Sequence, residues 1–405
     1  MKINRRTFLK ASGVVAIAVV GGSVYRAVDQ GVFSVGQGVA YEPWTHWRNA
    51  ATSSERIVCA GILAANPHNS QPWYFRISEQ AVDLYADYSR QIGVIDPVRR
   101  EMHIGLGCAV ENMTLAAQAE GFTVRVTLIP DSAYPDHVAH LALTPGQAQV
   151  SDLYSAIPSR HTNRSPYDTN KSVKADILDS LTALSNDDSV HVFWYADSSA
   201  RDKFGKIAIA AAQALIADEQ QSIDSNRWWR QGWSEVQTHA DGITIDAQSF
   251  DSLTDFAAKV LPDESRQQSD AIFVQNVRDN YVATAAAFGL ISVRDQSNNI
   301  QRIRCGQLWQ RIDLWATLHE LAMQPLNQMC ERADRERQWG IDPIFGRALR
   351  ELTGSDDWQG IMPFRLGYPT RPALPSPRRP FTTFCYKGKP EKLCDMEIES
   401  TAYRG

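Results

Sequence analysis

Two long helical stretches of this chain carry the same pattern of apolar and small residues, and this internal repeat limits the possible folds more than any other feature. A shift of 199 residues lays the stretch 104–121 on the stretch 303–320, with four identical positions: Ile104 and Ile303, Gly107 and Gly306, Leu115 and Leu314, Ala117 and Ala316. The apolar positions between them also coincide, which predicts the same buried face in both helices. Chance similarity between two buried helices is the alternative. We infer a duplicated core helix, which would let one chain imitate a homodimer.

The spacing of apolar residues predicts an α+β unit around each of these helices. For the first unit, residues 41–157, we expect helices at 46–65 and 104–121 and strands at 73–77, 82–85, 122–129 and 137–143. For the second unit, residues 158–405, we expect helices at 173–184, 200–220 and 303–323 and strands at 190–195 and 290–293. Residues 221–270 contain several Trp and Gly residues and weak periodicity, so we predict a lid-like excursion there.

The first forty residues look like a targeting segment and are left out of the fold prediction. Arg5 and Arg6 stand directly before Thr7-Phe8-Leu9-Lys10 and a short apolar run, an order typical of a twin-arginine export signal. The apolar run is shorter than the roughly 20 residues that span a bilayer. Small residues at Gly38 and Ala40 would suit a signal peptidase, and Tyr41 would then begin the mature chain. We therefore expect residues 1–40 to direct export by the twin-arginine translocase to the periplasm.

The composition and motifs argue against nucleic-acid binding and a metal site, and they leave one disulfide possible. The formal net charge is -5, and no run of Lys or Arg occurs outside the signal, so nucleic-acid binding is not expected. Six cysteines in 405 residues are too few for a disulfide framework, although Cys385 and Cys394 are close enough in sequence to bridge. His319-Glu320 begins like a zinc-protease helix, but Met stands at position 323 where the second ligand would be, and no metal site is expected.

A polar loop at 66–73 joins a helix to a strand and is the first candidate site. It reads Asn66-Pro67-His68-Asn69-Ser70-Gln71-Pro72-Trp73 and gathers amide side chains, an imidazole and an aromatic ring. Such a set suits a planar heteroaromatic ligand, which is recognised by a few polar groups on apolar walls. The alternative is an Asx-turn followed by Pro and a core Trp. The residues alone favour this alternative.

Two basic clusters are the other candidates. Residues 160–164 read Arg-His-Thr-Asn-Arg and offer guanidiniums for a phosphate and a hydroxyl for a polyol. Arg378 and Arg379 follow a Pro-rich approach and could complete an anion site from the C-terminal side. Taken alone, the first cluster is more typical of a solvated basic turn and the second of a surface pair of arginines.

Together, the three clusters resemble the flavin nitroreductase family, and in particular its fused, Acg-like branch. The resemblance rests on Arg160, Thr162 and Arg164, on the Asn-x-Gln-Pro-Trp loop ending at Trp73, and on the C-terminal Arg pair. It covers nearly all of the chain after the signal. It implies that FMN is held by these residues: Asn66, Pro67, His68, Asn69, Gln71, Arg160, His161, Thr162, Arg164, Arg378 and Arg379. The loop and the Arg-His-Thr-Asn-Arg segment each occur once, which implies two related halves forming a pseudo-dimer around a single FMN site, and a monomer.

The same resemblance implies the chemistry. It predicts a nitroreductase-like fold and an FMN-dependent oxidoreductase that passes hydride or electrons to nitroaromatic or quinone-like acceptors. No catalytic side chain is expected, because the chemistry occurs at the flavin N5. The donor is either NAD(P)H or, because nicotinamide cofactors are scarce outside the cytoplasm, a membrane or periplasmic reductant. The alternative is an exported protein that binds or sequesters flavin behind the lid-like excursion with little turnover.

Overall fold

The computed structural model describes residues 24–261 and 264–386. Its first half contains a sheet of the order β3-β4-β2-β1-β9. The strands are β1 (Trp73–Ile77), β2 (Ala81–Ala86), β3 (Phe122–Leu128), β4 (His137–Pro145) and β9 (Cys385–Tyr386). The helices of this half are α2 (Glu42–His46), α3 (Ser53–Gly61), α4 (Arg100–Ala119) and α5 (Asp152–Ala156).

The second half repeats this topology. Its sheet has the order β5-β6-β8-β7. The elements are α6 (Ala175–Thr182), β5 (Val190–Tyr195), β6 (Ala287–Val293), α12 (Asn299–Leu318), β7 (Ala322–Pro325) and β8 (Gln359–Gly367). When α12 is matched with α4, the strands β5, β6, β7 and β8 take the places of β1, β2, β3 and β4, and both sheets then have the same strand order. The predicted α+β fold with two related halves is therefore confirmed.

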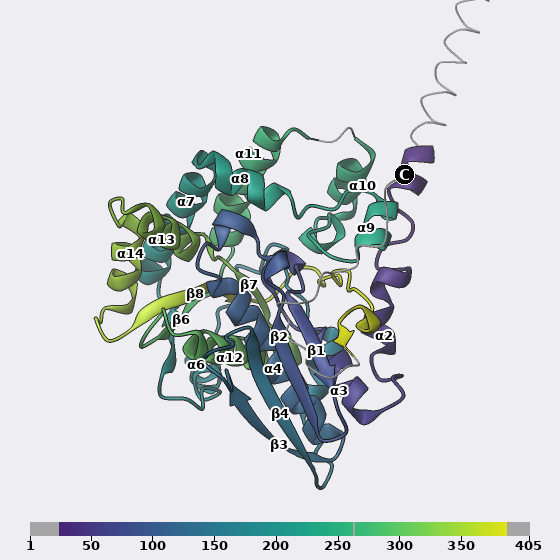
Figure 1. Cartoon of the computed structure of the whole chain (residues 1–405). Coiled ribbons are helices and arrows are strands. Elements are labelled where there is room, and N and C mark those ends of the chain that lie inside the picture. Colours follow the sequence, from purple (N-terminus) through teal and green to yellow (C-terminus); the bar gives the residue numbers. More distant parts are fainter. Residues whose placement is uncertain (1–23, 262–263, 387–405) are drawn as a thin grey trace, which may run out of the picture.

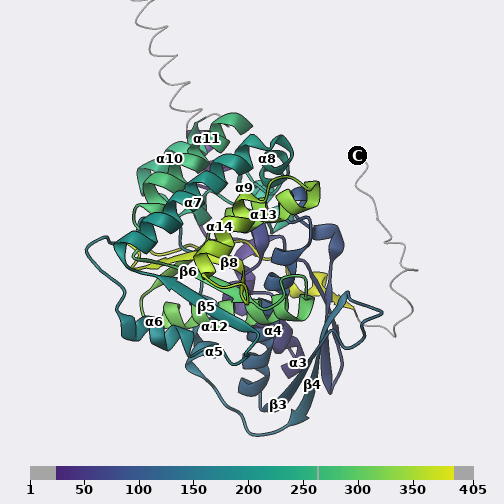
Figure 2. The same cartoon turned by 90° about the vertical axis from the view of Figure 1, so that its left-hand side faces the viewer.

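The side-chain contacts between α4 and α12 are equivalent to one another under the 199-residue shift. Gln310 donates to Asn112 Oδ1 at 2.9 Å, and Arg311 pairs with Glu111 at 3.2 Å. Under this shift Asn112 corresponds to Arg311, and Glu111 corresponds to Gln310. The two contacts therefore occupy equivalent positions, as two contacts related by a two-fold axis between subunits would. Figure 2 shows the two helices side by side at the centre of the molecule. The inferred duplication therefore places a pseudo-two-fold axis between α4 and α12.

The second half differs from the first by inserted helices. Between β5 and β6 lie α7 (Ser198–Ala217), α8 (Glu219–Asn226), α9 (Trp233–His239), α10 (Ser252–Val260) and α11 (Arg266–Asn276). Between β7 and β8 lie α13 (Gln328–Trp339) and α14 (Ile344–Thr353). In Figure 1, α7, α8, α11, α13 and α14 gather on one side of the molecule, away from β3 and β4.

The structure shows the local structure of the predicted excursion and corrects the end of the second long helix. The excursion 221–270 is largely helical, because Asp218, Asp251 and Ser265 cap the short helices α8, α10 and α11. These helices are too short for apolar periodicity to reveal them. The second long helix ends at Leu318, five residues before the predicted end at Met323. It stops because Glu320 adopts a left-handed conformation with φ 58° and Leu321 N donates back to Ala316 O.

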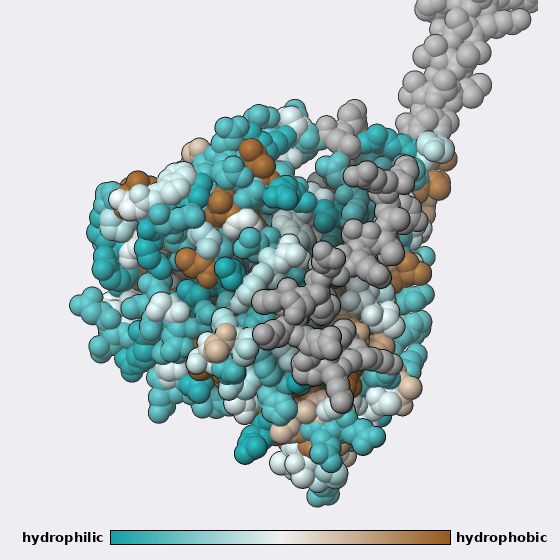
Figure 3. All heavy atoms as spheres, in the orientation of Figure 1, coloured by the Kyte–Doolittle hydropathy of each residue, from teal (hydrophilic) through white to brown (hydrophobic). Residues whose placement is uncertain are grey.

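The predicted export signal at residues 5–10 lies outside the described residues, but the predicted cleavage site does not. Ala40 and Tyr41 are buried, and Arg378 N donates to Ala40 O at 2.7 Å. Cleavage at this bond therefore requires the packed segment to open first. None of the helices within 24–261 and 264–386 is long and apolar enough to cross a bilayer. On the face shown in Figure 3, apolar residues form small separate patches on a mainly hydrophilic surface.

Candidate functional site

The predicted loop at 66–73 has an unusual backbone. His68, Asn69 and Gln71 have φ values of 48°, 52° and 53°, in the left-handed region that residues with a Cβ seldom adopt. The Asn66 side chain holds this shape, because its Oδ1 accepts a hydrogen bond from Gln71 N at 2.7 Å. Trp73 follows as a fully buried core residue. The loop is thus both a side-chain-stabilised turn and a strained segment, and strained segments cluster at functional sites.

The side chains of Asn69 and Gln71 bind other parts of the chain. Asn69 Nδ2 donates to the carbonyls of Gly242 and Pro377, and Gln71 Nε2 donates to Ala240 O at 2.8 Å. Gln71 Oε1 accepts from Arg379 N at 3.0 Å. These bonds join the loop to the excursion and to the C-terminal approach. The structure leaves Gln71 and Arg379 outside the walls of both cavities described next.

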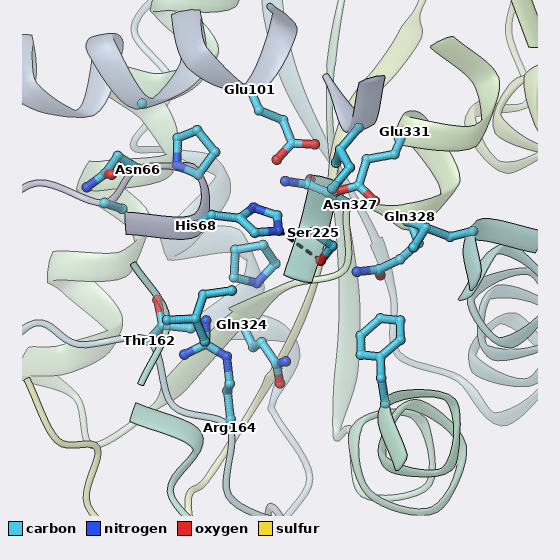
Figure 4. Close-up of a pocket in the computed structure, with 18 of the residues that line it drawn as sticks. Asn66, His68, Glu101, Thr162, Arg164, Ser225, Gln324, Asn327, Gln328 and Glu331 are labelled. Atoms are coloured by element: carbon cyan, nitrogen blue, oxygen red, sulfur yellow. Dashed lines mark hydrogen bonds between the residues drawn. The ribbon is translucent and has the colours of Figure 1, made fainter. Parts of the chain in front are cut away.

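The larger cavity, of about 240 Å³, lies between the two halves and the inserted helices (Figure 4). Five predicted residues line it: Asn66, Pro67, His68, Thr162 and Arg164. The excursion contributes Ser225, Trp229 and Ile243 to the wall, and α13 contributes Gln328 and Glu331. Residues of the predicted excursion 221–270 therefore form part of the cavity wall. The volume is slightly below the ~300–1,000 Å³ usual for small-molecule sites.

A smaller cavity of about 60 Å³ adjoins the first and shares Asn66, His68, Thr162 and Arg164 with it. Its other walls include four more of the predicted residues, Asn69, Arg160, His161 and Arg378. The structure therefore brings the basic clusters at 160–164 and at Arg378 together with the polar loop, although these segments are far apart in sequence.

Positive charge exceeds negative charge at the smaller cavity. Arg160 is buried and pairs with Asp313 at 2.9 Å. Arg378 donates to the Ile62 and Ala64 carbonyls, and Arg164 donates to Ala247 O at 3.0 Å. No carboxylate among the described residues pairs with Arg164 or Arg378. Burial, together with the charge of Arg160, lowers the pKa of Arg378 well below its usual value. The arrangement favours a bound anion.

The two histidines at the cavities are neutral. Burial and then the charge of Arg164 lower the pKa of His68 to about 4, and burial and neighbouring arginines lower that of His161 to about 3. His68 Nε2 lies 3.3 Å from Ser225 Oγ, and the His161 ring makes an edge contact with Trp44. His161 Nδ1 and Arg160 Nε are buried without a hydrogen-bond partner in the described part of the chain. Arg160 Nε can donate a hydrogen bond to a ligand, and His161 Nδ1 can donate or accept one, depending on the tautomer.

Sequence reasoning missed the acidic wall of the larger cavity. Glu101 and Glu331 both line it, from the first turns of α4 and α13. Helix α13 reads Gln-Met-Cys-Glu-Arg-Ala-Asp-Arg-Glu-Arg-Gln-Trp and would be predicted to be exposed, yet its residues from Met329 to Glu336 are buried. The partner of Arg160, Asp313, was missed as well, although its position on the buried face of a predicted helix was a usable signal.

Two imidazoles and a carboxylate also converge away from the cavities. His137 Nε2 and His140 Nδ1 lie 2.9 and 2.7 Å from Asp83 Oδ1, and the three ligand atoms are close enough to share a metal ion. The sequence did not indicate this group because β2 and β4 meet only in the folded sheet. Arg76 already pairs with the other oxygen of Asp83 at 2.7 Å, so the group is also complete as an ion-pair network. We assign no ion to it.

Comparison with known proteins gives sequence relatives. No family model matches the chain. A Mycobacterium tuberculosis protein provisionally named NAD(P)H nitroreductase is 31% identical over 126 residues, which are 30% of this chain and 36% of that protein. The chain thus matches about a third of that relative's length. Another M. tuberculosis protein, the provisionally named NAD(P)H nitroreductase acg, is 23% identical over 296 residues, 69% of this chain and 80% of that protein.

Solved structures give weaker likenesses. An FMN-dependent nitroreductase from Mycobacterium smegmatis in complex with NADPH aligns with 59% of this chain and 98% of its own, at 15% identity and a TM-score of 0.37. A nitroreductase with bound FMN from Bacteroides fragilis aligns with 62% of this chain and 99% of its own, at 15% identity and a TM-score of 0.31. At these scores the superpositions assign no residue of this chain to a ligand.

Proposed function

We propose that this chain, which is related in sequence to nitroreductase-like proteins over most of its length, is an FMN-dependent oxidoreductase. One observation carries the proposal. Arg160, Arg164 and Arg378 converge at two adjoining cavities, and among the described residues only one carboxylate, Asp313, forms an ion pair with any of the three. The phosphate of FMN supplies the missing negative charge, and a planar ring system suits the larger cavity with its mixed polar and apolar wall.

Different parts of FMN would lie in the two cavities. Arg160 and Arg378 would hold the phosphate, since both line the smaller cavity, and the hydroxyl of Thr162 at the junction would bind the ribityl chain. Arg164 and neutral His68 lie at the junction and would contact the ring, where buried positive charge stabilises an anionic reduced form. When bound, FMN supplies hydride transfer at N5. The chain itself orients the ligands and excludes water.

The visible absorbance spectrum of the purified full chain tests the cofactor. We expect a flavin band that is bleached by anaerobic dithionite. Arg164→Gln removes a half-buried cation that has one backbone hydrogen bond, and we expect it to weaken FMN retention by at least about tenfold, or ~1.4 kcal/mol. Arg294→Gln, at an exposed pair with Asp357, is the matched control. Full FMN content in Arg164→Gln would contradict the site assignment.

The substrates are inferred from the relatives. Both M. tuberculosis proteins carry names that specify NAD(P)H and nitroreduction, which supports a nicotinamide donor and nitroaromatic or quinone-like acceptors. Anaerobic mixing with NADH or NADPH tests the donor, because hydride transfer bleaches the flavin band. Bleaching by dithionite but by neither nucleotide would point to a membrane or periplasmic reductant instead.

A flavin-sequestering protein is the second candidate. The observation that favours it is the modest cavity of about 240 Å³, whose wall includes Ser225 and Trp229 of the inserted segment and leaves little space beside a bound ring. Stopped-flow reoxidation of the dithionite-reduced protein distinguishes the two. A rate that depends on the concentration of a quinone supports the oxidoreductase, and a rate independent of the acceptor supports sequestration.

Export and assembly complete the proposal. We infer that the Arg5-Arg6 signal directs the folded protein through the twin-arginine translocase, which suits a chain that must bind its cofactor before crossing. Replacing both with Lys should retain the protein in the cytoplasm on cell fractionation. The internal pseudo-two-fold pairing already supplies each half with its partner, so we expect a monomer, which light scattering can measure.

A further inference from the structure

Two carboxyl groups, one from each half of the molecule, meet in the wall of the larger cavity. Glu101 comes from the first turn of α4 and Glu331 from the first turn of α13, and they are 4% and 3% exposed. Figure 4 shows both side chains directed toward the cavity, beside Asn327 and across from His68 and Arg164. The two carboxyl groups lie close enough to affect each other's pKa, and the Asn327 side chain lies beside them.

The surroundings hold too little positive charge for all nearby acids to ionise. Arg100 pairs with Asp334 at 2.8 Å and with Glu101 at 3.2 Å, and Arg337 pairs with the other carboxylate oxygen of Asp334 at 3.4 Å. Asp96, from the loop before α4, adds a further carboxyl. On α13, Arg332 and Arg335 face away from the group and pair with Asp218 instead. Two cations therefore pair with members of this group of four buried acids, and among the described residues neither they nor any other cation forms an ion pair with Glu331.

Such a pair keeps a proton. Two carboxylates in contact repel each other, and burial further penalises the second charge. Burial raises the pKa of Glu101 to about 7, and burial together with the charge of Glu101 raises that of Glu331 well above its usual value. Glu331 Oε2 is buried and has no hydrogen-bond partner among the described residues. A dissociable proton is thus held next to the space where an acceptor would lie.

The other polar groups of the wall suit this task less well. His68 has a pKa of about 4 and carries no dissociable proton of the imidazolium at neutral pH. Asp270 accepts hydrogen bonds from Ser222 and Asn226. The Cys108 thiol is buried, and burial raises its pKa well above the usual value.

We propose that Glu101 and Glu331 form a proton-sharing pair that donates a proton to the acceptor during its reduction. This inference rests on the proposed oxidoreductase function. One carbonyl oxygen of a quinone-like acceptor would receive two electrons and one hydrogen as a hydride equivalent from the reduced flavin, which would be oxidised, and the O–H bond of the carboxyl pair breaks to give the other carbonyl oxygen its proton. The product is the hydroquinone. The pair is left with two negative charges and regains its proton from water, so atoms and electrons balance.

Infrared spectroscopy of the full chain detects the shared proton of the carboxyl pair without any enzymatic turnover. The carbonyl stretch of a protonated carboxylic acid should persist above about pH 6, where an ordinary Glu is ionised. Glu331→Gln should remove this band, whereas Glu111→Gln should leave the shared-proton band in place. Glu111 is a matched control, because it is buried on the same helix as Glu101 but pairs with Arg311 and does not line the cavity. Absence of the band in the unaltered protein would overturn the proposal.

Kinetics then test the donation. In Glu331→Gln and Glu101→Gln, acceptor reduction by the pre-reduced protein should slow by about 10²-fold or more, with FMN content unchanged. In the unaltered protein the same rate should fall as pH rises above about 7, because the pair loses its proton. Retained FMN with unchanged rates and an unchanged pH profile in both variants would overturn the pair's role alone. Failure of the unaltered chain to bind FMN would overturn the proposed function and, with it, the donation.

Discussion

Gly306 of α12 lies directly on the backbone of Ile104 of α4, where a Cβ atom on Gly306 would come 1.9 Å from the Ile104 carbonyl oxygen. The reverse contact also exists, because a Cβ atom on Gly107 would lie 2.0 Å from the Ile303 carbonyl oxygen. Gly107 and Ile104 become Gly306 and Ile303 under the 199-residue shift. The identical glycines of the repeat are therefore explained by the close crossing of the two helices, which only glycine permits.

Replacing Gly306 with Ala tests this crossing. The added methyl group meets rigid backbone on the facing helix, so we expect a loss of about 2–3 kcal/mol in the free energy of unfolding. Gly346→Ala is the control, because this helical glycine has its nearest atom at 3.4 Å and should gain up to ~1 kcal/mol from helix propensity. Equal effects of the two substitutions in denaturant unfolding would rule out the close packing of α4 on α12.

Replacing Asp313 with Asn tests the anion site. The change leaves buried Arg160 without a carboxylate, and we expect the unliganded protein to lose roughly 3–5 kcal/mol of stability. Inorganic phosphate should restore more stability in this variant than in the unaltered protein, because it takes the place of the lost charge. Thermal unfolding with and without phosphate measures both the loss of stability and its recovery. Asp357→Asn, at an exposed ion pair, is the control. An equal phosphate response in all three proteins would count against anion binding at Arg160.

Replacing Asp241 with Asn tests the attachment of the inserted segment over the cavity. Asp241 pairs with Arg90 and with Arg230, and the adjoining Gly242 bonds to Asn69 of the polar loop. Weakening these pairs should loosen the cover and speed FMN release by about tenfold, or ~1.4 kcal/mol. Release is followed by the rise of free-flavin fluorescence after dilution. Asp342→Asn, at an exposed pair with Arg347, should leave the rate unchanged; the same rate in Asp241→Asn would show that this contact does not retain the ligand.

His103 should make the protein less stable in acid. Its Nδ1 lies 2.7 Å from Arg99 O, its Nε2 is buried without a partner among the described residues, and burial lowers its pKa to about 4. Between about pH 6.5 and pH 4 the unfolded chain binds a proton that the folded chain does not, so stability is lost as pH falls through this window.

The substitution His103→Gln should reduce this acid-dependent loss by up to roughly 2–3 kcal/mol. Urea unfolding at a series of pH values measures it. His319→Gln is a matched control, since this exposed histidine makes the same kind of bond to the carbonyl of Trp315. Parallel pH curves for His103→Gln and the unaltered protein would contradict the buried, neutral imidazole.

Much of the fold was predictable where local pattern and tertiary environment agree. Strands β1 and β5 have the predicted bounds, because alternation reports a sheet face directly. The predicted helix 46–65 is too long, because α2 ends at His46 and α3 runs only over Ser53–Gly61, and here the sequence held an unused signal. Thr52 and Glu55 form a capping box that starts α3 at Ser53.

The site was predictable in part for the same reason. The polar loop and the 160–164 cluster each concentrate unusual residues within a few positions, so the sequence indicated them without knowledge of their distance in space. Their convergence on two adjoining cavities depends on the pairing of the halves. The sequence did not show that two residues of the polar loop have different roles. Asn66 lines both cavities, whereas Gln71 binds Ala240 O and Arg379 N.

By itself, the sequence determined the duplicated core helix, most strands and the basic and polar clusters, because hydrophobic periodicity and local composition act over a few residues. The tertiary structure alone decided which charged groups are buried. Glu331 lies on a helix that reads as solvent-exposed, yet it contacts Glu101 from the other half of the molecule. Burying a charge is tolerated only when partners from distant segments compensate it or when the group keeps its proton, and neither condition is encoded in the neighbouring residues.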